Sequence, residues 1–115
     1  MKKASRISHI QYPHFIPICE EMFEVCFDSE YKFLTNRRFQ FDFALPCCKL
    51  AIEVEGIHGS GGHRSVTNKL NDIEKQQLAT IEGWRMMSFP VQSITDLSFI
   101  EVLARYFAQN KCVHF

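Results

Sequence analysis

Three carboxylates stand at strand-like positions in the middle of the chain, within the stretch FDFALPCCKLAIEVEG of residues 41–56. Polar and apolar residues alternate there, so Asp42, Glu53 and Glu55 fall at positions that are half buried in a sheet. Removing an unpaired charge from water costs several kcal/mol or more. Either a positive group neutralises these carboxylates, or they line a site that is open to a ligand.

The strands that carry the acids are predicted from this alternation. In residues 37–45 (RRFQFDFAL) phenylalanines alternate with other residues, and in residues 50–55 (LAIEVE) aliphatic side chains alternate with alanine and the two glutamates. The link between the runs is short, so an antiparallel hairpin is the natural pairing. The phenylalanines of the first run then share one face with the aliphatic residues. The three carboxylates gather on the other face.

Three like charges a few ångströms apart repel one another unless a cation lies among them. Mg²⁺ or Mn²⁺ suits hard oxygen ligands of this kind and fills its remaining positions with water or phosphate oxygens. Such an ion activates a water molecule and neutralises the charge that builds on a phosphodiester under attack. The cluster of Asp42, Glu53 and Glu55 therefore predicts a metal site. The alternative is an exposed sheet face with unpaired acids.

The remaining elements are predicted from helical periodicity and turn residues. They are a helix behind Pro17, a helix over residues 68–82 ended by Gly83, a strand over 84–89, and a helix over 93–110 with Ser93 as its cap and Asp96 in a capping box. The helix between the second and third strands makes those strands parallel. The predicted fold class is α/β, a small mixed sheet flanked by helices in a single domain of residues 15–115. Residues 1–14 are expected to form a loosely ordered arm.

The helix of residues 68–82 has two stripes. Leu70, Ile73, Gln77 and Ile81 form an apolar one, and Asp72, Lys75 and Ala79 lie roughly opposite at about 100° per residue. The sequence leaves open whether the second stripe faces the metal site or solvent. Lys75 is either a site residue or the partner of Asp72 on a wet surface.

Length and composition fit one soluble domain. The chain has 115 residues, of which 46% are hydrophobic, and its net charge is zero, so any binding to nucleic acid must come from a local patch. The basic start lacks the apolar run of a signal peptide, and nowhere do 18 apolar residues follow one another. We expect a cytoplasmic protein without a membrane span.

The motifs carry a family resemblance. Asp42, ten residues, then Glu53-Val54-Glu55 resembles the Asp…(Asp/Glu)-x-Lys signature of the PD-(D/E)XK nuclease superfamily, in a variant with glutamate at the lysine position. Over residues 37–89 the chain is similar to small phage and bacterial endonuclease-like proteins related to the very-short-patch-repair group. The shared features are an Arg-Arg-aromatic-x-Phe-Asp-Phe strand, an Ile-Glu-x-(Glu/Asp)-Gly strand, a Gly/His/Arg loop, an Asp-x-x-Lys helix and a Gly-Trp-Arg turn.

The resemblance implies a restriction-endonuclease-like fold and a Mg²⁺- or Mn²⁺-dependent endonuclease that cuts DNA in a bacterial or phage-infected cell. It makes Asp42 and Glu53 metal ligands. Glu55 is then a further ligand or orients the attacking water, and Lys75 replaces the lysine that the signature lacks. Members of the superfamily often add an acid from the first helix, for which Glu20 is the candidate; a solvated helix face is the alternative for this residue.

A glycine-rich loop and a set of basic residues complete the candidates. The run GGHR resembles the family loop, which makes His63 a candidate general acid or base, and the neighbouring His58 a candidate contact to phosphate. Loop histidines that are simply exposed are the alternative. A local basic rim for DNA phosphates is formed by Arg37, Arg38, Arg64 and Lys69, whose alternative role is solubility.

Two functions from other classes stay open. The chain is also consistent with a nucleic-acid-binding module that keeps the fold without cutting, because the lysine of the signature is missing. A second alternative is a structural or interaction protein whose carboxylates bind a stabilising ion. A chain of this length has little room for a separate recognition domain, so a homodimer, formed through an aromatic-rich helix or a sheet edge, is a further hypothesis.

Overall fold

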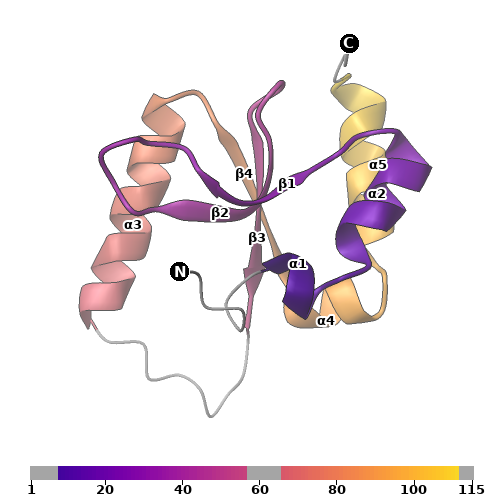
Figure 1. Cartoon of the computed structure of the whole chain (residues 1–115), viewed down its shortest axis with the longest axis horizontal. Helices are drawn as coiled ribbons and strands as arrows, with labels where there is room; N and C mark the ends of the chain where they lie inside the picture. Colours follow the sequence, from indigo (N-terminus) through magenta and orange to yellow (C-terminus); the bar gives the residue numbers. More distant parts are fainter. Residues whose placement is uncertain (1–7, 57–65, 112–115) are drawn as a thin grey trace.

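The computed structural model describes residues 8–56 and 66–111. Along the chain the elements are α1 (Ser8–Gln11), α2 (Phe15–Phe23), β1 (Asp28–Lys32), β2 (Gln40–Leu45), β3 (Leu50–Glu55), α3 (Val66–Ile81), β4 (Arg85–Pro90), α4 (Val91–Thr95) and α5 (Phe99–Gln109). Figure 1 shows their arrangement. No helix within these residues has the length and apolar character needed to cross a bilayer. Helix α1 lies within residues 1–14, which were expected to form a loosely ordered arm. Residues 1–7 of that arm lie outside the described part of the chain.

The strands form one mixed sheet in the order β1-β2-β3-β4. Strands β2 and β3 pair antiparallel, and β4 runs parallel to β3 after the crossover helix α3, so both predicted pairings are confirmed. Strand β1 pairs antiparallel with β2 and was not predicted. Its sequence DSEYK has no apolar alternation, and it becomes a strand because β2 offers a partner.

Helices cover both faces of the sheet. Figure 1 shows α3 on one face and α1, α2, α4 and α5 on the other, which makes a three-layer α/β domain. The larger core lies under α2 and α5, where the fully buried Phe15 stacks on Phe43 at 4.3 Å between ring centroids and lies 4.9 Å from Phe99. This aromatic group joins two helices to the centre of the sheet.

A smaller core fills the space under α3. It is built around Trp84 and Phe41, whose ring centroids lie 4.9 Å apart, together with three buried alanines, Ala44, Ala51 and Ala79. Small side chains on both the sheet and the helix let the two approach closely. Trp84 therefore packs between the sheet and α3.

The prediction that the phenylalanines of β2 share one face is wrong for Phe41. Phe43 packs under α2, whereas Phe41 packs under α3, where it stacks on Phe33 at 4.3 Å. The change of face coincides with a bend in the pairing of β1 with β2. The register passes from Ser29↔Phe43 to Tyr31↔Phe41, and Glu30, opposite Asp42, has the left-handed φ of 54°. Figure 1 shows β1 crossing at this bend from the side of α2 towards the side of α3.

Helix α3 presents to the sheet the stripe that the sequence left undecided. Ala79 is fully buried and Lys75 is half-buried, whereas Leu70, Ile73 and Ile81 are 59%, 48% and 74% exposed. The apolar stripe, which periodicity alone would place in the core, therefore points outwards. The small sheet-facing residues allow close packing, and an ion pair made by Lys75 fixes the rotation of the helix, as described below.

Helix α3 ends just before Gly83, as predicted from the sequence. Gly83 has the left-handed φ of 88° expected of a helix terminator. The Lys49 Nζ donates a hydrogen bond of 2.7 Å to the Glu82 carbonyl oxygen, so a cation stands beside the negative end of the helix dipole.

The helix expected over residues 93–110 is two helices. Helix α4 starts directly after β4 with Pro90 as its cap, so the capping box of Ser93 and Asp96 is not formed. Leu97, with φ 67°, breaks the chain between α4 and α5, and the Asp96 carboxylate accepts a hydrogen bond of 2.9 Å from the Ser98 amide in this turn.

We expect Phe15→Ala to lower the free energy of unfolding by about 3–5 kcal/mol, because it removes a fully buried ring that contacts both helices and the sheet. The matched control is Met22→Ala on the same helix, since Met22 is 55% exposed, and its effect should stay below about 1 kcal/mol. Urea unfolding followed by Trp84 fluorescence measures both. Equal effects would contradict the assignment of Phe15 to the main core.

Candidate active site

Asp42 and Glu53 lie side by side on neighbouring strands. The regular pairing of β2 and β3 runs from Leu45↔Leu50 to Phe43↔Ile52, and the next step places Asp42 beside Glu53. The Asp42 amide donates a hydrogen bond of 3.4 Å to Glu53 Oε2, and the Val54 amide donates one of 2.7 Å to Asp42 Oδ2. Each carboxylate thus accepts a backbone amide of the opposite strand, at the point where the hairpin bends.

Helix α3 brings a cation to this pair. The Lys75 Nζ lies 3.0 Å from Glu53 Oε2, and the two side chains are only 14% and 16% exposed. The same ammonium lies 5.6 Å from the centroid of the Phe41 ring, within the range of a cation–π contact. Lys75 therefore belongs to the carboxylate site.

The pKa of Glu53 is raised from 4.5 to about 7. Burial is the largest cause, and the nearby Asp42 carboxylate adds to it, while Lys75 and the Asp42 amide oppose it. Desolvation thus outweighs the ion pair. A further positive charge at this carboxylate would favour its ionised form.

Tyr12 adds a hydroxyl to the surroundings of Asp42. Burial raises the pKa of this half-buried tyrosine, and the Asp42 carboxylate raises it further, which requires the two groups to lie within electrostatic reach. Tyr12 also packs against the main core. Nothing in the sequence indicated it, because it falls in the segment that was expected to be a loose arm.

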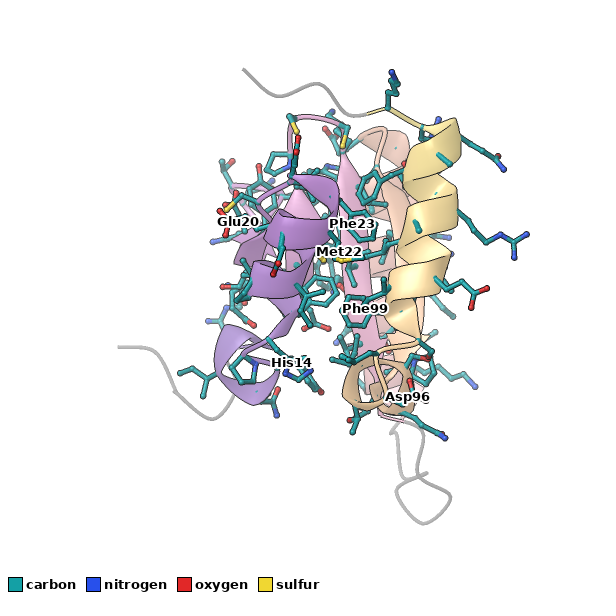
Figure 2. All side chains as sticks on the ribbon, turned by 90° about the vertical axis from the view of Figure 1, so that its right-hand side faces the viewer. His14, Glu20, Met22, Phe23, Asp96 and Phe99 are labelled. Atoms are coloured by element: carbon teal, nitrogen blue, oxygen red, sulfur yellow. The ribbon has the colours of Figure 1, made fainter. Side chains whose placement is uncertain are left out.

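The other two predicted acids do not join the pair as a larger cluster. Glu55 is half-buried at the end of β3, in register with Pro90 of β4. Glu20 is exposed on α2, and Figure 2 shows it on the side of that helix away from α5. Across residues 8–56 and 66–111, no three His, Cys, Asp or Glu side chains gather in a way that could hold a metal. The site assembled by the described residues is two carboxylates and one ammonium.

The predicted basic rim is divided. Arg37 makes two hydrogen bonds of 3.0 Å to Glu74 of α3, and its guanidinium lies 4.7 Å from the centroid of the Phe39 ring. Arg38 and Lys69 are exposed. The remaining candidates, His58, His63 and Arg64, lie outside the described residues. Arg37 therefore helps to hold α3 against the loop before β2.

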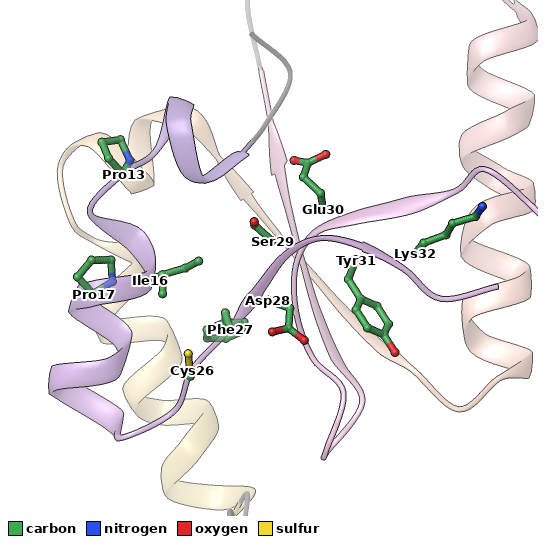
Figure 3. Close-up of a pocket in the computed structure, with 10 residues that line it drawn as sticks. All are labelled: Pro13, Ile16, Pro17, Cys26, Phe27, Asp28, Ser29, Glu30, Tyr31 and Lys32. Atoms are coloured by element: carbon green, nitrogen blue, oxygen red, sulfur yellow. The ribbon is translucent and has the colours of Figure 1, made fainter. Parts of the chain in front are cut away.

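An open groove of about 790 Å³ runs along β1, separate from the carboxylate pair. Figure 3 shows it between β1 and the start of α2, with Pro13 and Pro17 on one side. Its charged lining residues are two acids and one base, Asp28, Glu30 and Lys32. This charge does not suit a DNA backbone, so the groove does not extend the candidate site.

Comparisons of the chain with known protein families, with curated proteins and with solved structures find no match in any of the three. The functional argument therefore depends on the chemistry of the site.

The two neighbouring carboxylates fit a divalent ion. Mg²⁺ is usually held through one or two carboxylates, with water and substrate phosphate completing its shell. Asp42 and Glu53 provide these two oxygen donors from adjacent strands. The burial that raises the pKa of Glu53 also gives its ionised form a reason to bind a cation.

The pH dependence of stability tests the environment of Glu53. Because the pKa of this carboxyl is higher in the folded state, the folded protein keeps a proton that the unfolded chain has released between pH 4.5 and about 7. Stability is therefore lost as the pH rises through this window and is level above it. Between pH 4.5 and about 7, we expect the free energy of unfolding of the wild type to fall by up to about 3 kcal/mol relative to that of Glu53→Gln. Urea unfolding of both proteins at a series of pH values, without divalent ions, measures the difference, and parallel curves would contradict the raised pKa.

Proposed function

We propose that this protein is a Mg²⁺- or Mn²⁺-dependent endonuclease that hydrolyses DNA phosphodiester bonds, and that its sheet and helices form a restriction-endonuclease-like fold. One observation carries the proposal. Asp42 and Glu53 lie side by side on antiparallel strands, with the Lys75 ammonium 3.0 Å from Glu53. Two acids and a lysine are the residue types of the PD-(D/E)XK signature, which the spacing of Asp42 and Glu53 in the sequence also resembles.

The order of the elements supports the same proposal. Helix α2 precedes the β2–β3 hairpin, α3 crosses over, and β4 returns parallel to β3. This is the core order helix-strand-strand-helix-strand that the resemblance implies. Strand β1 adds an edge to that core, between the first helix and the hairpin.

The residues of the site divide the chemistry between them. A bound divalent ion would activate a water and neutralise charge on the phosphate. Asp42 and Glu53 are the side chains that would hold it. Lys75, kept beside Glu53 by the ion pair, offers its ammonium to the phosphate oxygens, a role that the carboxylate of Glu55 cannot fill. The lysine of the proposed mechanism thus comes from α3 and not from β3.

A second candidate function is a DNA-binding module that does not cut. The observation in its favour is that both carboxylates already accept hydrogen bonds within the fold, Glu53 from Lys75 and Asp42 from the Val54 amide. Carboxylates with these partners also suit a purely structural role at the bend. A binder of this kind would keep its affinity for DNA when the acids are replaced.

Cleavage of supercoiled plasmid and of branched DNA in Mg²⁺, Mn²⁺ or EDTA tests the proposal. We expect cutting that needs metal and falls to background in Asp42→Asn. Lys75→Met should lose at least about 100-fold in rate, with partial recovery in Lys75→Arg. Glu101→Gln, an exposed acid on α5, is the matched control and should cut like the wild type. DNA binding that persists in Asp42→Asn, with no cutting by any protein, would favour the binding module.

Metal binding can be measured without DNA. At pH 8 we expect saturating Mg²⁺ to raise the melting temperature of the wild type by a few degrees, because an ion that binds only the folded state stabilises it. Asp42→Asn should lose this rise, and Glu101→Gln should keep it. The same melting temperature in Mg²⁺ and in EDTA for the wild type would contradict a metal site at the carboxylate pair.

A further inference from the structure

The outer face of α3 carries three large aliphatic side chains that are exposed among the described residues. Leu70, Ile73 and Ile81 are each about half or more exposed, as given above. Figure 1 shows α3 alone on its side of the sheet among the elements of residues 8–56 and 66–111, so no other helix of these residues lies over this face. Three large aliphatic side chains in one line on a small domain indicate an interaction surface.

The spacing along this face is that of a two-helix seam. Leu70, Ile73, Gln77 and Thr80 follow one another at steps of three, four and three residues, which are the a and d positions of a heptad repeat. All four are exposed. The residues that face the sheet fall at other heptad positions, Lys75 at f and Ala79 at c. The helix therefore has one face for its own domain and another with the pattern that a partner helix needs.

We propose that a second copy of this chain covers this face, so that two α3 helices pack in parallel about a twofold axis. The argument for a second copy is self-complementarity in charge. Lys69 at g and Glu74 at e are five residues apart, and in a parallel pair g of one helix meets the following e of its partner. The twofold axis makes this opposite-charge contact twice.

Two further residues favour the parallel arrangement. Gln77 occupies an a position, where it meets its own copy, and an amide is both a donor and an acceptor, so the two can bond to each other. Glu74 is half-buried and held by two hydrogen bonds from Arg37, which fixes its carboxylate at the edge of the seam. In an antiparallel pair, e positions would meet each other, and Glu74 would lie against the apolar Ile81.

The size of the seam sets the strength of the dimer. The 16 residues of α3 span about 24 Å, which gives two heptads and an interface smaller than the roughly 800 Å² per partner of a standard complex. We expect the dissociation constant of the dimer to be on the order of 10 to 100 µM. This inference does not depend on the nuclease activity.

The oligomeric state tests the seam. Sedimentation equilibrium of the full chain from about 10 µM to 1 mM, without DNA or metal, should show a monomer–dimer equilibrium. Ile73→Glu, which sets two like charges against each other across the axis, should weaken it by at least about tenfold. Asn71→Glu introduces the same charge on the same helix away from the seam and should dimerise like the wild type. Circular dichroism confirms that both variants are folded.

Disulfide formation between introduced cysteines tests whether the two α3 helices pack in parallel. Leu70→Cys places a thiol at the axis of a parallel pair, and mild oxidation should give a covalent dimer in a yield well above that of the wild type, which accounts for the native cysteines. Asn71→Cys, one residue away and off the seam, is the matched control. A protein that stays monomeric at 1 mM, or an Ile73→Glu variant that dimerises like the wild type, would overturn the proposal. A weakened Ile73→Glu dimer without the Leu70→Cys product would overturn the parallel pairing.

Discussion

The arrangement of this protein depends on the ion pair between Lys75 and Glu53. It joins the crossover helix to the centre of the sheet, with both side chains mostly withdrawn from water. Breaking this pair is costly, since the Lys75 ammonium would remain as a mostly buried charge without the Glu53 carboxylate beside it. Helix α3 cannot turn its apolar stripe inwards without breaking it. One contact therefore sets the rotation of the helix, the position of the Lys75 ammonium beside the carboxylate pair, and the exposure of the outer face.

Much of the fold could be predicted because its patterns are local. Alternation in residues 37–55 predicts β2 and β3, and the helical pattern before Gly83 predicts the parallel return of β4. Features that depend on contacts with a neighbouring element of the fold could not be predicted. Strand β1 has no apolar alternation and forms because β2 is beside it. The change of face at Phe41 coincides with the left-handed φ of Glu30, which the residue type does not indicate, since this conformation favours glycine.

The site was predictable to a similar extent. Register alone brings Asp42 and Glu53 together, so their adjacency follows from alternation. Periodicity predicts two stripes on α3 and would place the apolar one in the core. The other stripe faces the sheet, because Ala79 packs closely there and Lys75 pairs with Glu53, and neither contact can be read from hydrophobicity. The influence of Asp42 on Tyr12 could not be predicted, because it arises from the packing of the N-terminal segment onto the core, between residues far apart in the sequence.

The β1 edge of the sheet is poorly suited to accept a further strand. Strand β1 is the outer strand of the sheet beside β2, and it carries Asp28, Glu30 and Lys32, with a left-handed residue at its middle. A flat apolar edge would accept a further strand from another molecule, whereas charges and a bend hinder the added strand. At this edge, therefore, a strand from another molecule has little opportunity to extend the sheet.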